Sequence, residues 1–210
     1  MAFVRERTRL APVPLVPEIA LWQATEVTPL WQDTAAELAG WDDAPFWAFP
    51  WAGGQALARH VLDAPGLVRG RRVFDFGTGS GLVAIAAMLA GAAEAVAADV
   101  DPFCAAAVRL NAEQNGVAVR FRPGDALGDP LDGFEVVLAG DVFYERGLAE
   151  AALPWLRRLA ARGATVWVGD PGRIYSPAGG LSEIASHDVP TPLEIEDRPV
   201  RRTRVLEVLP

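Results

Sequence analysis

The stretch Val73-Phe-Asp-Phe-Gly-Thr-Gly-Ser-Gly81 decides how the rest of this chain is arranged. It begins with apolar residues of the kind that a buried parallel strand uses. Glycines at alternate positions follow, and then an Ala-rich apolar segment, Leu82 to Ala90, which favours a buried helix. Glycine permits positive φ angles and close approach of the backbone to a ligand, and a helix N-terminus offers free amides to a negative group. The stretch therefore predicts a strand, a turn and a helix that cradle a nucleotide-like ligand.

The spacing of the glycines separates two kinds of ligand. The dinucleotide fingerprint needs glycines at its first, third and sixth positions, and counted from Gly77 the sixth position is Leu82. The order of acid and glycines instead resembles the first motif of S-adenosylmethionine-dependent methyltransferases. That resemblance implies S-adenosylmethionine as cofactor, bordered by the residues of the turn: Asp75, Gly77, Thr78, Gly79 and Gly81. The motif is common, and a tight turn without a ligand is the alternative.

Composition limits the classes of partner. The 210 residues suffice for one well-cored α/β domain. The net charge is −8 and no long basic run is present, which argues against a nucleic-acid partner because phosphate neutralisation requires clustered cations. The longest apolar run, Leu82 to Ala93, is too short to span a bilayer, so we expect no membrane partner. The single cysteine, Cys104, cannot form an internal disulfide and fits a reducing compartment. We also expect no metal site.

Polar segments follow the predicted strands. Strands and helices alternate between Val73 and Val168, which predicts a mostly parallel, doubly wound α/β sheet. Ligands bind such sheets at the carboxyl ends of the strands, near the switch point. The segments at those ends are Gly77–Gly81, Asp99, Asp125, Asp141–Tyr144 and Gly169–Arg173. We therefore expect one site along this rim.

The N-terminal part of the chain is irregular. Residues 1–50 are rich in proline and tryptophan, and we expect them to form an arm that packs on the main domain, residues 51–210. Trp22 and Trp31 are interpreted as a covering layer over the sheet. Trp51 precedes Gly53-Gly54 and a predicted helix, Gln55 to Asp63, and its indole either lies against an adenine or packs on the domain.

The C-terminal part alternates weakly. Leu181 to Ala185 is predicted to be at most a short helix. Leu193 to Asp197 and Thr203 to Leu209 are candidate antiparallel strands. We therefore expect a hairpin at the end of the chain.

Two acids on the rim suit an adenosine. A carboxylate at the end of the second strand, Asp99, can accept hydrogen bonds from both vicinal hydroxyls of a ribose. Asp125, after the third strand, is placed to accept a hydrogen bond from an adenine amino group. In the alternative interpretation, Asp99 is a turn residue and Asp125 belongs to a solvated Pro-Gly-Asp turn.

Methyl transfer from a sulfonium requires an aligned nucleophile about 3 Å from the methyl carbon, with a free lone pair. A lysine amine is protonated at neutral pH because its ordinary pKa is about 10.4. Asp141 and Tyr144, in one loop after the fourth strand, supply a carboxylate and a ring wall that would neutralise, orient and enclose such an amine. The alternative for Tyr144, and more so for its neighbour Phe143, is packing against the next helix.

The loop after Gly140 is similar to a known element. Asp141-Val-Phe-Tyr144 resembles the Asp-x-x-Tyr element of the family-16 seven-strand protein methyltransferases. Further segments resemble one branch of that family, the electron transfer flavoprotein β-subunit lysine methyltransferases. These segments are Pro17-Glu-Ile19, Trp47-Ala-Phe-Pro-Trp-Ala-Gly-Gly-Gln-Ala-Leu57, Asp99-Val-Asp-Pro102, Gly140-Asp-Val-Phe-Tyr-Glu145 and Gly169-Asp-Pro-Gly-Arg173. The similarity extends from about Pro17 to Ile174.

The resemblance implies a Rossmann-like, seven-stranded methyltransferase fold with an antiparallel last strand. It implies S-adenosylmethionine as methyl donor and a lysine of a folded protein as acceptor. Carried over by position, Asp141 and Tyr144 flank the target amine. The residues placed with the cofactor are Trp51, Gly77, Gly79, Asp99 and Gly140.

These observations lead to one hypothesis with alternatives. We expect a protein-lysine methyltransferase acting on the electron transfer flavoprotein β-subunit or on a ribosomal protein. The alternatives are a small-molecule N-methyltransferase and a cofactor-binding regulatory module without catalysis. We expect a monomer, located in the cytoplasm of a bacterium or in the mitochondrial matrix of a eukaryote.

Overall fold

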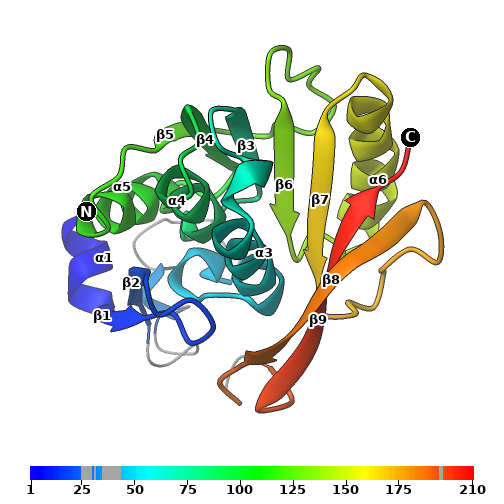
Figure 1. Cartoon of the computed structure of the whole chain (residues 1–210). Helices are drawn as coiled ribbons and strands as arrows, with labels where there is room; N and C mark the ends of the chain where they lie inside the picture. The colour runs from blue at the N-terminus through cyan, green and yellow to red at the C-terminus, as the bar shows by residue number, and fades with distance from the viewer. Residues whose placement is uncertain (25–29, 31, 35–43, 194–195) are drawn as a thin grey trace.

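The structure, a computed structural model, describes residues 1–24, 30, 32–34, 44–193 and 196–210. Its central feature is a seven-stranded sheet with helices on both faces, and a two-stranded sheet lies near the N-terminus (Figure 1). The elements in chain order are α1 (Ala2–Arg7), β1 (Arg9–Pro12), β2 (Ala20–Gln23), η1 (Phe46–Ala48), α3 (Ala52–Asp63), η2 (Pro65–Leu67), β3 (Arg72–Phe76), α4 (Leu82–Leu89), β4 (Glu94–Asp99), α5 (Cys104–Gln114), β5 (Arg120–Pro123), β6 (Val136–Gly140), α6 (Arg146–Ala161), β7 (Thr165–Asp170), β8 (Leu181–Pro190) and β9 (Val200–Val208).

The strand order determines where a ligand would bind. The strands of the large sheet lie in the order β5-β4-β3-β6-β7-β9-β8. Strands β3 to β7 are parallel to one another, whereas β9 is antiparallel to both of its neighbours. This confirms the predicted mostly parallel, doubly wound sheet with an antiparallel last strand. The order reverses between β3 and β6, so the carboxyl ends of these strands form the switch point at which such sheets bind ligands.

Side chains alternate along the central strands and build a core on each face of the sheet. On β3, Phe74 and Phe76 belong to the cluster that α6 covers, whereas Val73 belongs to the cluster under α3 and α4. Trp155 of α6 packs edge-on against Phe76, with ring centroids 4.8 Å apart. Because both faces are covered, every residue of β3 from Val73 to Phe76 is buried, and its apolar residues predict a buried strand.

Helix α3 begins earlier than predicted. The sequence suggested a helix over Gln55–Asp63, but both Gly53 and Gly54 lie in its first turn. Packing explains the glycines: a Cβ on Gly53 would overlap the carbonyl oxygen of Gly169 at the end of β7, and a Cβ on Gly140 would lie 2.9 Å from the Gly54 nitrogen. Low intrinsic helix propensity is therefore overridden by close contact between α3 and the ends of β6 and β7.

The C-terminal prediction was wrong in two places. Leu181–Ala185, expected to be at most a short helix, is the first half of strand β8. Leu193–Asp197 was expected to be a strand. The residues of this range that the structure describes belong instead to the connection between β8 and β9. Strand β8 lies at the edge of the sheet and buries few of its side chains, so its sequence alternates weakly. Thr203–Leu209 falls almost entirely within β9, which pairs with β8.

A buried side chain of α5 connects the N-terminal residues to the glycine turn. The Asn111 side chain accepts a hydrogen bond from the Trp22 backbone amide at 2.8 Å and donates one to the Ser80 carbonyl at 2.8 Å. Asn111 is fully buried. The partly buried Trp22 packs in a cluster with α5, whereas Trp31, the other tryptophan predicted to cover the sheet, lies outside the described residues.

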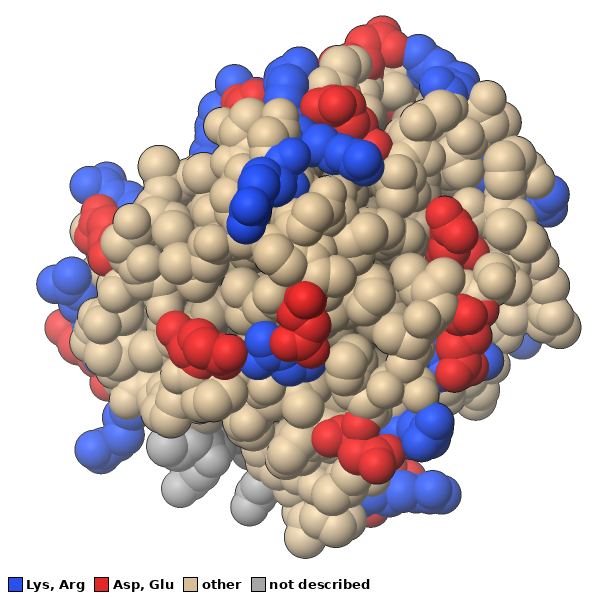
Figure 2. Space-filling model, in the orientation of Figure 1, with Lys and Arg blue, Asp and Glu red and all other residues tan. Residues whose placement is uncertain are grey.

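Acidic and basic side chains are mixed on one face of the molecule. In the view of Figure 2, several basic side chains lie close together near the top with acidic side chains among them, and elsewhere on this face basic and acidic side chains are scattered. In the same described residues, every helix is too short or too polar to cross a bilayer.

Candidate active site

A cavity of about 470 Å³ lies at the carboxyl ends of β3, β4 and β6. This volume falls within the usual range of small-molecule sites, about 300–1,000 Å³. Gly81 does not border the cavity; it precedes α4, where a Cβ would press on Val108 of α5. The predicted site residues that do border it are Trp51, Asp75, Gly77, Thr78, Gly79, Asp99, Asp125, Gly140, Asp141 and Tyr144. The structure thus brings strand ends that are far apart in sequence to one space.

The turn after β3 needs glycine for its backbone. The φ angles of Gly77, Gly79 and Gly81 are 64°, 52° and 85°, in the left-handed region that other residues avoid. A Cβ built on Gly77 would meet only the Val142 side chain, at 4.0 Å, so the backbone there faces open space. Helix α4 begins directly after the turn, and its N-terminus supplies amide donors to the same region.

Asp75, near the end of β3, stabilises this turn through hydrogen bonds. Its Oδ2 accepts a hydrogen bond from the Thr78 hydroxyl at 2.6 Å and another from the Ala84 amide in the first turn of α4, at 3.1 Å. Burial raises the pKa of Asp75 to about 7, against the opposing effect of these two donors. Both hydrogen bonds join Asp75 to the turn and to the start of α4. Asp75 therefore stabilises the turn as well as forming part of the cavity wall.

Asp99 and Asp125 border the cavity with different surroundings. Asp99 is half-buried; its Oδ2 accepts the Gly79 amide at 2.8 Å and its Oδ1 accepts the Asp101 amide at 3.0 Å. The Cys104 thiol also donates to Asp99, so about one of the four lone-pair sites of the carboxylate is left for a ribose hydroxyl. Asp125 is exposed, and its Oδ1 accepts the Leu127 amide at 2.8 Å, as in a turn.

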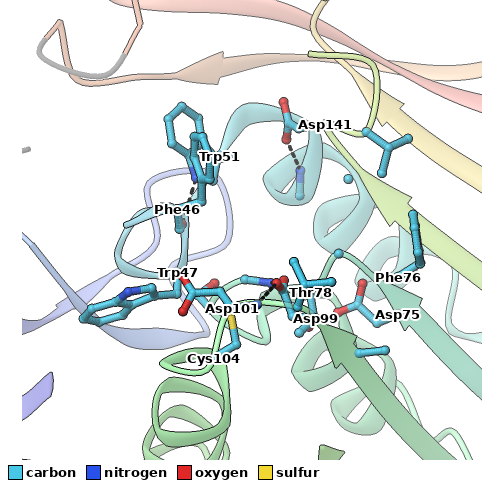
Figure 3. A pocket seen from close by; sticks show the side chains of 18 of the residues that line it. Phe46, Trp47, Trp51, Asp75, Phe76, Thr78, Asp99, Asp101, Cys104 and Asp141 are labelled. Atoms are coloured by element: carbon cyan, nitrogen blue, oxygen red, sulfur yellow. Dashed lines mark hydrogen bonds between the residues drawn. The ribbon is translucent and has the colours of Figure 1, made fainter. Parts of the chain in front are cut away.

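Aromatic rings form the wall near Asp141. The Trp51 indole donates a hydrogen bond to the Phe46 carbonyl at 2.9 Å, and the Arg173 guanidinium lies 5.6 Å from the centre of the Trp51 ring. Figure 3 shows Trp51 and Phe46 at the end of the cavity near Asp141, with the acids of β3 and β4 at the other end. The exposed Tyr144 ring lies 5.4 Å from that of Phe46. Stacking of Trp51 on an adenine stays a prediction.

Asp141 is held between a helix end and an arginine. Its Oδ2 accepts the Gly54 amide of α3 at 3.1 Å, and its Oδ1 accepts Nη2 of Arg173 at 2.7 Å and Nε at 3.1 Å. The φ of Asp141 is 58°, an uncommon conformation for a residue other than glycine. Burial raises the pKa of Asp141, while Arg173 and the Gly54 amide oppose that rise. Phe143, in the same loop, is fully buried in the core, as the packing interpretation predicts.

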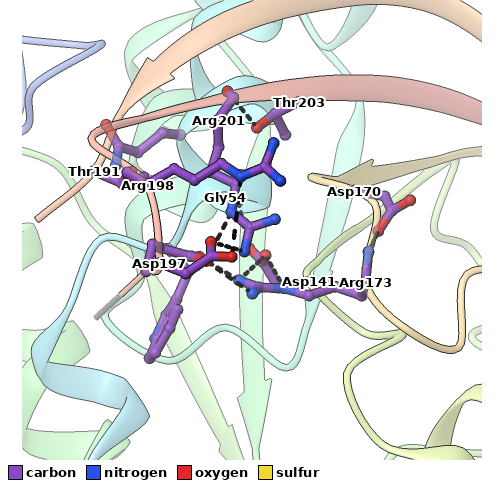
Figure 4. A network of polar contacts seen from close by, with 12 residues as sticks. Gly54, Asp141, Asp170, Arg173, Thr191, Asp197, Arg198, Arg201 and Thr203 are labelled. Atoms are coloured by element: carbon purple, nitrogen blue, oxygen red, sulfur yellow. Dashed lines mark hydrogen bonds and ion pairs between the residues drawn. The ribbon is translucent and has the colours of Figure 1, made fainter. Parts of the chain in front are cut away.

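Sequence reasoning missed Arg173 and Glu196 as site residues. Arg173 also binds Glu196, at 2.6 and 3.1 Å, and Glu196 binds Arg201 of β9 at 3.2 Å. Figure 4 shows Asp141 and Arg173 in this network, with Arg201 approaching from β9. The Glu196 side chain is only 3% exposed. Arg173 belongs to the Gly-Asp-Pro-Gly-Arg segment, which could have indicated it, whereas nothing local to Glu196 predicts that the β8–β9 connection folds back onto this site.

The described residues contain no group of three or more His, Cys, Asp or Glu side chains placed to hold a metal ion. Cys104 borders the cavity, and burial raises the pKa of its thiol well above the ordinary value. The thiol is therefore protonated at neutral pH and is a poor nucleophile.

Comparison with known proteins adds the family context. A family model described as ribosomal protein L11 methyltransferase (PrmA) matches residues 57–140. The chain is 40% identical over 174 residues to the electron transfer flavoprotein beta subunit lysine methyltransferase of Xenopus laevis, covering 82% of this chain and 70% of that protein. It is 35% identical over 216 residues to the protein of that name in Rattus norvegicus, covering 100% of this chain and 84% of that protein.

A solved structure shows the same fold. An RNA methyltransferase from Salinibacter ruber, in complex with S-adenosyl-L-homocysteine, superposes with a TM-score of 0.50 at 18% identity, covering 73% of this chain and 90% of that one. At this identity the likeness concerns the fold alone. The matches to the Xenopus laevis and Rattus norvegicus proteins, in contrast, extend over both ends of the cavity.

Proposed function

This chain belongs to the family of electron transfer flavoprotein beta subunit lysine methyltransferases, and we propose that it methylates a lysine side chain of that subunit. The observation that carries the proposal is a single cavity that joins the glycine turn and Asp99 to the loop Asp141–Tyr144. A methyl donor bound at one end and an amine bound at the other would meet inside it.

The residues at one end of the cavity fit S-adenosylmethionine. The backbone at Gly77 is open, Gly79 faces Phe46 and Trp47 at ordinary contact distance, and Asp99 keeps a lone pair that would accept a ribose hydroxyl. Asp125, on the rim of the same cavity, would accept the adenine amino group. We call this set, with Asp75 and Thr78 beneath it, the cofactor side. S-adenosylmethionine supplies a methyl group on a sulfonium sulfur, which an amine lone pair can displace.

The residues at the other end fit a lysine amine. Asp141 offers a carboxylate whose orientation is fixed by Gly54 and Arg173, and Tyr144 offers an exposed ring in the cavity wall. Together they would orient the amine and shield it from water. We call Gly54, Asp141, Tyr144, Arg173 and Glu196 the acceptor side.

The match to the ribosomal protein L11 methyltransferase model supports the cofactor side alone. It covers residues 57–140 and therefore ends one residue before Asp141. The match to the flavoprotein methyltransferase of Rattus norvegicus covers this whole chain, and therefore the acceptor side as well. We therefore choose the flavoprotein subunit as acceptor and keep the ribosomal protein as a second substrate to assay.

The direct experiment is mass spectrometry of electron transfer flavoprotein after incubation with the purified chain and S-adenosylmethionine. We expect a mass gain of whole methyl groups on a lysine of the beta subunit. Asp141→Asn should slow transfer about 100-fold or more, because the amine loses the fixed carboxylate oxygen that would orient it. Asp188→Asn, which changes an exposed carboxylate on β8, should leave transfer unchanged.

Three outcomes would contradict the proposal. Methyl label found only in the small-molecule fraction of a lysate would indicate a metabolite N-methyltransferase. Binding of S-adenosylhomocysteine without transfer to any protein would indicate a regulatory module. Transfer that is unaffected by Asp141→Asn, with normal cofactor affinity, would place the amine elsewhere.

A further inference from the structure

We propose that this site takes its acceptor lysine as an uncharged amine, and that Arg173 is the positioning residue responsible. This inference rests on the proposed function and concerns the protonation state in which the acceptor binds. Its basis is the geometry around Asp141, the carboxylate nearest to the proposed position of the amine.

The carboxylate of Asp141 is already occupied on both oxygens. Arg173 makes two hydrogen bonds to Oδ1, at 2.7 and 3.1 Å, and the Gly54 amide makes one to Oδ2, at 3.1 Å. The side chains of Asp141 and Arg173 are only 12% and 16% exposed. Two guanidinium nitrogens on one shielded carboxylate oxygen form a charge-assisted pair that is strong and fixed in orientation. Oδ2 keeps one lone pair, so it can still accept an N–H of a neutral amine.

Arg173 is itself fixed from the opposite direction. Glu196, in the connection between β8 and β9, binds both Nη1 and Nη2 of Arg173 and is almost fully buried. Arg201 of β9 binds Glu196 at 3.2 Å and the exposed Asp197 at 2.6 Å. Acidic and basic side chains therefore alternate across the acceptor side, in the order Asp141, Arg173, Glu196 and Arg201. Among the described residues of this network, each buried carboxylate is paired with an arginine.

The other charged groups near Asp141 do not change this balance between carboxylates and arginines. Asp170, at the end of β7, is paired with Arg204 at 2.8 Å. Glu145 follows Asp141 in the same loop, is exposed, and borders the cavity, as does the hydroxyl-bearing Tyr144. From the side of α3 the site receives only backbone amide dipoles, which favour negative over positive charge.

This balance disfavours an incoming ammonium group. A free lysine, with a pKa of about 10.4, is almost entirely protonated at neutral pH. An unpaired Asp141 would stabilise that ammonium, whose nitrogen has no lone pair to attack a methyl group. With Arg173 in place, the acceptor loses one proton to the buffer as it binds, and the neutral nitrogen keeps its lone pair.

The test measures that proton directly, without turnover. Electron transfer flavoprotein is titrated calorimetrically into the chain saturated with S-adenosylhomocysteine, in phosphate and in Tris at about pH 7.5, and the difference in heat gives the protons released. We expect about one proton per acceptor bound. In Arg173→Gln the release should fall toward zero, and the pH profile of kcat should move to higher pH by about one unit or more.

Matched variants separate positioning from folding. Arg202→Gln removes an exposed arginine of β9, which contacts the exposed Asp188 rather than Asp141, and should keep full proton release. Glu196→Gln should move the kcat profile in the opposite direction to Arg173→Gln, because it removes a negative charge. If Arg173→Gln does not fold, as judged by melting, Arg173→Lys should keep the proton release but lower kcat, because a lysine cannot place two nitrogens on the carboxylate oxygen.

The outcomes also distinguish this inference from the proposed function. Acceptor binding without proton release by the wild type, or a lower rate in Arg173→Gln with an unshifted pH profile, would overturn the inference alone. Absence of both binding and methylation of the flavoprotein would instead reject the proposed function.

Discussion

The two sides of the cavity are assembled from contacts of different range along the chain. On the cofactor side, the Thr78 hydroxyl bonds to Asp75, 3 residues away, and the Gly79 amide bonds to Asp99, 20 residues away. On the acceptor side, Asp141 bonds to Gly54 across 87 residues and to Arg173 across 32. The cofactor side is thus formed by consecutive elements from β3 to the end of β5, whereas the acceptor side exists only when α3, β6 and β7 have come together.

The glycines show the same difference. Gly77 and Gly79 are needed for their own positive φ angles. Gly53, Gly140 and Gly169 have no such angle; they are needed because α3 touches the ends of β6 and β7. A glycine motif therefore has two physical meanings, local conformation in the first group and close approach of distant segments in the second.

The largest effect should come from breaking that close approach. A Cβ on Gly169 would overlap the carbonyl oxygen of Gly53, so Gly169→Ala should destabilise the chain by about 3 kcal/mol or more. For a chain of this length that corresponds to a fall in Tm of roughly 6–12 °C. Gly66→Ala, where nothing lies within 4 Å, is the matched control. Equal melting of the two variants would show that α3 is not held by this contact.

The same difference explains how far the sequence predicts this molecule. The run Val73–Gly81 predicts its strand, turn and helix because each depends on neighbouring residues. Asp99 and Asp141 are predicted because they end strands, and a parallel sheet brings strand ends to one rim. Glu196 is not predictable in this way, since its role depends on how the β8–β9 connection folds back. Leu181–Ala185 lies on an edge strand, where apolar and polar residues alternate only weakly, so its sequence does not predict a strand.

On the cofactor side, Asp99→Asn should weaken S-adenosylhomocysteine binding about tenfold or more. The change replaces one acceptor oxygen by an amide group that would face the Gly79 or Asp101 amide, and a ribose hydroxyl loses a charged acceptor. Asp125→Asn should cost less, because Asp125 is exposed. Calorimetric titration measures both affinities. A larger loss in Asp125→Asn would mean that the ribose is not held by Asp99.

The turn should also carry a pH signature. Since burial raises the pKa of Asp75 from 3.8 to about 7, the folded state prefers the protonated carboxyl. The stabilising effect is complete below the unfolded pKa and declines as pH rises toward about 7. Asp75→Asn removes this titration, so its Tm relative to wild type should improve between about pH 4 and 7 and level off above that. A difference in Tm that is constant over that range would contradict the prediction, whatever its sign.

The smallest expected effect concerns the support of α3 on β8, on which the acceptor side depends. Burial lowers the pKa of His60 on α3, with a further contribution from His187 on β8, and burial likewise lowers the pKa of His187. A lowered histidine pKa means that the unfolded chain takes up protons first, so stability should fall as pH drops below about 6.5. Both rings are only partly buried, with Asp63 close enough to favour protonation of each, so we expect a shift in Tm of roughly 1–3 °C between about pH 7 and 5.5.

His60→Gln and His187→Asn should flatten that dependence of Tm on pH, and S-adenosylhomocysteine affinity should stay constant because the cofactor side does not depend on this contact. A slope that is unchanged in both variants would exclude the histidine pair as its source, and an affinity that falls with it would mean that the two sides of the cavity are coupled through α3.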